Sequence, residues 1–114
     1  MVEDDADQQK KIGDLLKEHH YEVEIAQDGS EALTQVRKAA PGLILLDAIL
    51  PKMNGFQVAR LLKFDEKTKG IPIVMLTVLN RPADQEKGKE VGVDLYLLKP
   101  FTEQGLLDAI RKFL

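Results

Sequence analysis

Hydrophobic positions fall into two kinds of segment that alternate along the chain. Continuous apolar runs, which are typical of strands buried on both faces, predict strands at 42–47, 71–77 and 94–100. Apolar residues spaced three or four apart among charges predict helices at 8–20, 28–40, 54–67 and 102–114. The polar stretch 83–91 is predicted as a further helix with little apolar stripe, and the alternating stretch 21–26 as a short strand.

Strands and helices that alternate with short links predict an open α/β fold. Strands that are apolar on both sides need helices over both faces of the sheet, which is typical of parallel sheets. The apolar pair Met1-Val2 counts as the first strand, although it is only two residues long. Asp28 and Glu31 resemble a capping box at the start of the second helix, and His20 is expected to close the first helix in a left-handed conformation.

Polar side chains stand at the carboxyl ends of the predicted strands. The acidic run 3–5 follows the first strand, and Asp47 ends the third. Thr77 ends the fourth strand, and Lys99 ends the fifth. Because the carboxyl ends of parallel strands meet at one crevice, we expect these residues to lie close together.

This set of side chains predicts phosphoryl-transfer chemistry. Carboxylates within a few ångströms of one another repel, and a proton or a cation must relieve the repulsion. Oxygen ligands without Cys or His favour a hard divalent ion, and Mg²⁺ is the ion expected. A metal, a lysine and a hydroxyl can hold the oxygens of a phosphoryl group, and aspartate is a known nucleophile that gives an aspartyl-phosphate.

The composition narrows the class of protein. The chain has 114 residues, 44% of them hydrophobic, which suits one folded domain. It has no cysteine, which excludes disulfides and thiolate metal sites and agrees with a cytoplasmic location. The formal net charge of −3 argues against direct nucleic-acid binding by this domain. No apolar stretch is long enough to span a membrane, so no membrane partner is expected.

Five segments in order resemble the receiver domain of two-component response regulators, over nearly the whole chain. They are "VEDD" at 2–5, "YEVEIAQDGSEAL" at 21–33, "LILLDAILPKMNGF" at 43–56, "IPIVMLT" at 71–77 and "LYLLKPF" at 95–101. The resemblance implies a doubly wound (βα)5 fold, an open parallel five-stranded sheet in the order 2-1-3-4-5 with helices on both faces. A single receiver domain over 1–114 is expected, with Mg²⁺ as its cofactor.

The resemblance implies a role for each residue of an acceptor and metal site. Asp47 matches the phosphoacceptor aspartate, which is also a metal ligand. Asp4 matches a direct metal ligand, and Glu3 matches a ligand that acts through water. Ile49 would lend only its backbone carbonyl to the metal. Because three acids stand in a row, the metal-binding pair is either Glu3-Asp4 or Asp4-Asp5.

The resemblance also implies a switch at the other strand ends. Thr77 matches the hydroxyl that binds the phosphoryl group, and Lys99 matches the lysine that pairs with it, followed by a cis peptide bond to Pro100. Tyr96 matches an aromatic residue that swings inward when the threonine moves, with a half-buried packing role as the equal alternative. Partners would then read the surface of the helix at 83–91, the strand at 94–100 and the last helix.

These roles predict a signalling switch and not an enzyme. The only reactions expected are transfer of a phosphoryl group to the domain itself and its slow removal. A sensor histidine kinase or a histidine phosphotransfer protein would donate the phosphoryl group, and an output domain, a target protein or a second copy in a homodimer would respond. The alternative is a pseudo-receiver that docks or dimerises without phosphate, which Val78 and the short first strand favour modestly. A phosphatase or a flavodoxin is disfavoured, because residue 49 is not a second acid and no phosphate loop follows the first strand.

Two departures from the family pattern carry expectations. Ile49 and Leu79 place apolar side chains where many relatives have polar ones, so attacking water would be poorly positioned and dephosphorylation slow. The first strand has two apolar residues where receiver domains usually have four or five. Either the chain is trimmed there, or it is a part of a longer response regulator.

Overall fold

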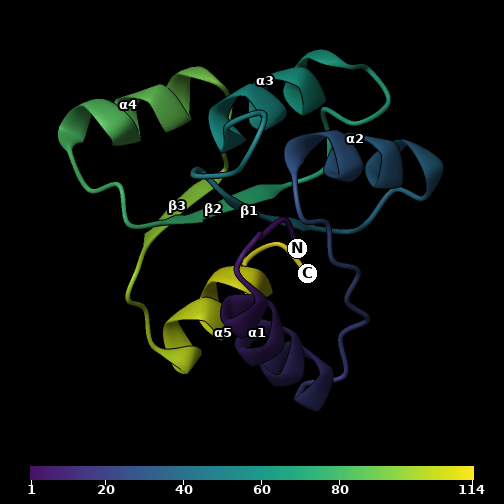
Figure 1. Cartoon of the computed structure of the whole chain (residues 1–114), viewed down its shortest axis with the longest axis vertical. Coiled ribbons are helices and arrows are strands. Elements are labelled where there is room, and N and C mark those ends of the chain that lie inside the picture. Colours follow the sequence, from purple (N-terminus) through teal and green to yellow (C-terminus); the bar gives the residue numbers. More distant parts are fainter.

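Helices lie on both sides of a central sheet in the computed structural model, which describes all residues 1–114 (Figure 1). The strands are β1 (Ile44–Asp47), β2 (Ile73–Thr77) and β3 (Leu95–Leu98). The helices are α1 (Ala6–Glu18), α2 (Gly29–Lys38), α3 (Gly55–Phe64), α4 (Pro82–Glu90) and α5 (Glu103–Arg111). From α2 onward helix and strand alternate, as the apolar pattern predicts.

The sheet is parallel, with β2 between β1 and β3. In its register Leu46 lies opposite Met75, and Met75 lies opposite Tyr96. Every residue of β1 and β2 is buried, as expected for strands that helices cover on both faces. All three strands run in the same direction, so their carboxyl ends share one edge of the sheet.

The segment before α1 joins this sheet through a single residue. Val2 forms isolated parallel bridges to Ala26 on one side and to Leu46 on the other. The sheet therefore has three strands and not the expected five, and the order 2-1-3-4-5 is not confirmed. Two apolar residues are too few to form a ladder, so the segment 21–26 has too short a neighbour to become a regular strand.

The apolar side chains form two clusters, one on each face of the sheet. Figure 1 shows α2, α3 and α4 over one face and α1 and α5 over the other. Leu46 and Met75 belong to the first cluster, whereas Leu45 and Val74 belong to the second, because successive strand residues point to opposite faces. None of the helices combines the length and apolarity that crossing a membrane requires.

Side-chain caps set the helix ends. Asp28 accepts a hydrogen bond from the Glu31 backbone, as predicted. Asp5 accepts one from the Asp7 backbone, so α1 begins at Ala6 and not at residue 8. His20 has a φ of 69°, the left-handed conformation that was predicted to close this helix.

Helical spacing identifies some of the residues on the buried face of α3, and Val58 and Leu61 depart from it. The spacing of Phe56, Ala59 and Leu62 in the predicted helix 54–67 indicates a common face, and all three are buried. Val58 joins them with no exposed surface, whereas Leu61, a further candidate for this face, is 44% exposed. Val58 packs toward α2, where an added Cβ at Gly29 would overlap its side chain. The contact between α2 and α3 therefore decides which residues of α3 are buried.

Candidate functional site

Four of the predicted site residues lie at the carboxyl edge of the sheet because each directly ends or follows a strand or bridge. Asp47 is the last residue of β1, and Thr77 is the last residue of β2. Lys99 follows β3, and its backbone N–H donates to the Thr77 carbonyl at 2.9 Å. Glu3 follows the bridge residue Val2. The parallel topology thus gathers residues that are up to 96 positions apart in the chain.

The ammonium group of Lys99 joins two carboxylates at this edge. Its Nζ donates to Asp47 Oδ2 at 2.8 Å and to Glu3 Oε2 at 3.1 Å. The side chains are largely withdrawn from water, with exposed fractions of 15% for Lys99, 10% for Asp47 and 5% for Glu3. Charge-assisted hydrogen bonds of this kind are stronger than neutral ones, and burial strengthens them further.

The cluster holds two acids and one base, so its charges do not balance. Burial raises the pKa of Glu3, and the neighbouring Asp47 raises it further, while the Lys99 ammonium acts in the opposite direction. Burial by itself would lower the pKa of Lys99, but the carboxylates of Asp47 and Glu3 outweigh it and raise that pKa. The site therefore favours an added cation or a proton, and a cationic Lys99.

The Asp47 carboxylate is also held by backbone. Its Oδ1 accepts a hydrogen bond from the Ile49 N–H at 2.9 Å, an Asx-type turn that fixes the side-chain direction. The first residue of α3, Gly55, lies against the carbonyl of Asp47, and its N–H donates to the Ala48 carbonyl at 2.8 Å. An added Cβ at Gly55 would overlap the backbone of Asp47. Glycine is therefore required here for close approach of two backbone segments.

The backbone of Leu79 links Thr77 to Tyr96. The Leu79 N–H donates to the hydroxyl oxygen of Thr77 at 3.3 Å, and the Tyr96 hydroxyl donates to the Leu79 carbonyl at 2.7 Å. Thr77 is fully buried, and Tyr96 is half-buried against the cluster under α2 and α3. The Tyr96 ring thus packs against the apolar cluster on the α2 and α3 side of the sheet.

The acidic run 3–5 divides between three environments. Glu3 is buried beside Lys99, whereas Asp4 is exposed and Asp5 caps α1. No group of three or more His, Cys, Asp or Glu side chains is arranged to hold a metal ion. The oxygen donors present still fit Mg²⁺, because this ion keeps several waters and is commonly held by one or two carboxylates. The peptide bond between Lys99 and Pro100 is cis, as predicted.

Sequence reasoning missed three contributors to this edge. Gly55 and the backbone of Leu79 act through main-chain atoms, whose positions no residue type announces. Gln9 of α1 donates its side-chain amide to the Glu3 carbonyl at 2.6 Å. Among these features only the Asn54-Gly55 pair carries a signal in the sequence, because Asn-Gly is typical of turns; Asn54 forms a capping box with Gln57 at the start of α3.

Comparisons with known proteins agree with this architecture. A family model described as the response regulator receiver domain matches residues 1–111. The DNA-binding response regulator MtrA of Mycolicibacterium paratuberculosis is 40% identical over 111 residues, which are 97% of this chain and 48% of MtrA. The chain therefore spans about half the length of this curated relative.

Solved structures show the same fold. The chemotaxis protein CheY4 of Vibrio cholerae superposes with a TM-score of 0.93 at 34% identity, covering 99% of this chain and 94% of that one. The receiver domain of the sensor histidine kinase PA1611 from Pseudomonas aeruginosa, described with a magnesium ion in its active-site cleft, gives a TM-score of 0.91 at 28% identity over 98% of this chain and 92% of its own. The chain belongs to the family of response regulator receiver domains.

Proposed function

We propose that this domain is a phosphorylation-activated switch that accepts a phosphoryl group on Asp47. The observation that carries the proposal is the convergence of Asp47, Lys99 and Glu3 within hydrogen-bonding distance at the strand ends, next to Thr77. This set contains an oxygen nucleophile, a fixed positive charge and a hydroxyl. Positioning and charge neutralisation are nearly all that phosphoryl transfer requires of a protein.

The proposed transfer starts from a phosphohistidine of a sensor histidine kinase or a histidine phosphotransfer protein. A carboxylate oxygen of Asp47 forms a bond to phosphorus while the bond from phosphorus to the donor imidazole breaks, and the imidazole leaves with its electron pair. Lys99 is already 2.8 Å from the Asp47 carboxylate, where it can bind an oxygen of the incoming group. The Thr77 hydroxyl oxygen accepts the weak 3.3 Å contact from the Leu79 N–H, and its O–H is the group that would donate to a phosphoryl oxygen.

Mg²⁺ is the proposed cofactor. Asp4, Asp47 and the Ile49 carbonyl would hold it directly, and Glu3 would hold it through water. The ion would neutralise charge on the phosphoryl oxygens. The surplus of negative charge around Glu3 and Asp47 supports this proposal, as does the magnesium ion described in the PA1611 receiver domain.

We infer slow loss of the phosphoryl group from the apolar rim of the site. Ile49 is 51% exposed and Val78 is 58% exposed, and Leu79 lies half-buried beside them. These side chains offer no hydrogen bond to orient an attacking water. Replacing Ile49 and Leu79 with polar residues should shorten the lifetime of the aspartyl-phosphate, and an unchanged lifetime would contradict this inference.

The proposed readout is the face built by α4, β3 and α5, which contains Tyr96. Movement of Thr77 toward the phosphoryl group would stretch the Leu79 N–H contact, and the Tyr96 hydroxyl is bound to the carbonyl of the same residue. The partner would be an output domain, a separate target or a second copy of this domain. MtrA is named a DNA-binding response regulator and is about twice as long as the matched region, which supports an output domain as the partner.

The proposal is tested by treating the purified protein, in the presence of Mg²⁺, with acetyl phosphate as a phosphoryl donor or with beryllofluoride as a phosphoryl mimic. After acetyl phosphate treatment, intact-mass analysis should find a phosphoryl adduct on the wild type and on Asp108→Asn, which changes an exposed carboxylate of α5. Asp47→Asn should give no adduct. NMR shifts should report the conformational change, because the chain has no tryptophan. If Asp47→Asn and the wild type respond alike, the protein is a pseudo-receiver instead.

A further inference from the structure

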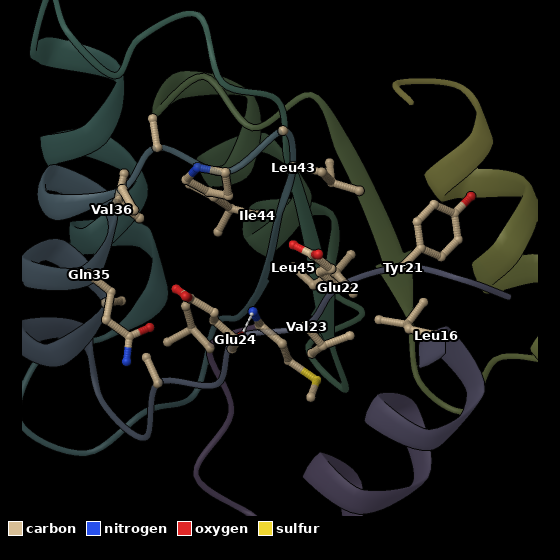
Figure 2. Close-up of a pocket in the computed structure, with 18 of the residues that line it drawn as sticks. Leu16, Tyr21, Glu22, Val23, Glu24, Gln35, Val36, Leu43, Ile44 and Leu45 are labelled. Carbon is tan, nitrogen blue, oxygen red and sulfur yellow. Dashed lines mark hydrogen bonds between the residues drawn. The ribbon is translucent and has the colours of Figure 1, made fainter. Parts of the chain in front are cut away.

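The backbone that leads into the acidic run 3–5 is held by the neighbouring segment at Glu3. The Glu3 N–H donates to the Ala26 carbonyl at 3.0 Å. The large cavity on the amino-terminal side of the sheet, which Leu45 and Glu24 help to line, is bordered by none of residues 3–9 (Figure 2). Beyond Glu3 the run leaves the sheet, and the contacts that hold it come from α1.

Gln9 of α1 holds the two carbonyls that flank Asp4. Its side-chain Nε2 donates to the Glu3 carbonyl at 2.6 Å, and its backbone N–H donates to the Asp5 carbonyl at 2.9 Å. The second bond is the ordinary hydrogen bond of a helix, which any residue except proline would make at this position. The bond from the side chain to Glu3 is therefore the contribution that depends on glutamine.

The Glu3 carbonyl and the Asp4 N–H belong to one planar peptide unit. The bond from Gln9 is the only hydrogen bond that this unit makes within the protein, since the Asp4 N–H has no acceptor there. Asp4 is exposed, and its carboxylate takes part in no hydrogen bond or ion pair. Gln9 thus limits rotation of the peptide plane, and with it the direction in which the Asp4 side chain leaves the backbone.

We propose that Gln9 is a positioning residue, which holds the peptide plane between Glu3 and Asp4 and so keeps the Asp4 carboxylate available to a cation bound at Asp47. This inference rests on the proposed function, in which Asp4 and Asp47 hold Mg²⁺. The Glu3 side chain has supports of its own, because it accepts hydrogen bonds from Lys99 Nζ at 3.1 Å and from the Asp5 N–H at 3.2 Å. The placement of Asp4 depends on the backbone alone.

The chemistry of the amide suits this role. Glutamine donates a hydrogen bond without adding a charge, whereas an ionised glutamate has no proton to donate and a lysine would add a positive charge near the cation. Loss of a group that orients a metal ligand typically weakens metal binding by about 10- to 100-fold. Since Gln9 acts on the backbone and not on the carboxylate itself, we expect an effect at the lower end of this range.

Magnesium binding to the purified protein tests this role without any phosphoryl donor. Gln9→Met keeps the length of the side chain and removes the donor, and Gln9→Ala, which favours a helix, is a second variant without a donor. Gln8→Met is the matched control, because Gln8 is also a half-buried residue of α1 and its side chain makes no hydrogen bond within the protein. NMR of the backbone amides during addition of MgCl₂ gives the dissociation constant, and relaxation of the Asp4 amide without metal gives its order parameter.

Both Gln9 variants should raise the dissociation constant for Mg²⁺ by about tenfold. Without metal, they should lower the order parameter of the Asp4 amide from about 0.85 to below about 0.6. Gln8→Met should match the wild type in both measurements. An unchanged dissociation constant or order parameter in the Gln9 variants, or equal effects of Gln8→Met, would overturn the role of Gln9 alone. A wild type that binds no Mg²⁺ would overturn the proposed cofactor together with this role.

Discussion

Removal of the Lys99 charge should destabilise the protein through the two carboxylates that it leaves behind. In Lys99→Gln, Glu3 and Asp47 remain beside each other with no cation, and both are at most 10% exposed. Breaking a buried ion pair by removing one partner costs about 3–5 kcal/mol. Uptake of a proton by Glu3 limits this cost, since its pKa is already raised by burial and by Asp47. We therefore expect a loss of about 3 kcal/mol at neutral pH.

The same charge argument predicts the effect of removing one of the two carboxylates beside Lys99. Asp47→Asn leaves one carboxylate for one ammonium, so the variant should be as stable as the wild type or more stable. In the background of Lys99→Gln, the same change removes the repulsion between the two acids. The double variant should therefore recover at least half of the loss, which a double-mutant cycle expresses as a coupling free energy.

Urea unfolding followed by circular dichroism, without Mg²⁺, measures all four proteins. With a slope of about 2 kcal/mol per molar urea, a 3 kcal/mol loss lowers the midpoint by about 1.5 M. Lys63→Gln is the matched control, because Lys63 Nζ also forms a 2.8 Å ion pair, with Asp94, far from Asp47. Asp47→Asn should not recover the stability of Lys63→Gln. The charge argument is refuted if Lys99→Gln unfolds at the wild-type midpoint. It is also refuted if Asp47→Asn fails to restore the stability of Lys99→Gln, or restores the stability of Lys63→Gln as well.

Three further predictions concern single contacts and can be measured in the same urea series. Gly55→Ala should lower the free energy of unfolding by more than about 1 kcal/mol, because the added Cβ would overlap the backbone at the end of β1. Gly13→Ala is its control, because Gly13 has open space around it, and it should raise the free energy of unfolding by about 0.5–1 kcal/mol. Tyr96→Phe removes the hydroxyl that donates to the Leu79 carbonyl and should lower the free energy of unfolding by about 0.5–1.5 kcal/mol, and an unchanged urea midpoint would contradict this. The raised pKa of Glu3 means that the folded state holds this proton more tightly than the unfolded state, so stability falls as pH rises through the raised pKa. Glu3→Gln should therefore exceed the wild type in stability at neutral pH but not below the ordinary carboxyl range, and a pH-independent difference would contradict this.

The fold was predictable where the pattern of apolar residues is long and continuous. The runs ending in Asp47 and Thr77 became β1 and β2, because strands buried on both faces leave no other arrangement of apolar side chains. The segment 21–26 did not become a strand, since pairing depends on the length of a neighbour and not on its own alternation. Leu61 shows the same limit within a helix, where packing between α2 and α3 selects the buried positions.

The candidate site was predictable as far as it consists of side chains at strand ends. The closeness of Glu3, Asp47 and Lys99 follows from parallel topology and needs no knowledge of their contacts. The contacts made by main-chain atoms, such as those of Leu79, were not predictable, because every residue carries the same backbone groups. Their partners depend on loop conformation, which the order of residues around Thr77 does not specify.

The packing of Gly55 against Asp47 makes the two flanks of the acceptor residue mechanically unequal. On one flank, the amino-terminal end of α3 touches the main chain of β1 and donates a hydrogen bond to Ala48, so no space remains there for displacement. On the opposite flank, the loop after β2 contacts the Thr77 hydroxyl through a long hydrogen bond of 3.3 Å and is held, further away, by the Tyr96 hydroxyl. Movement at Asp47 is therefore more restricted toward α3 than toward the loop that precedes α4, so the two flanks differ before any partner binds.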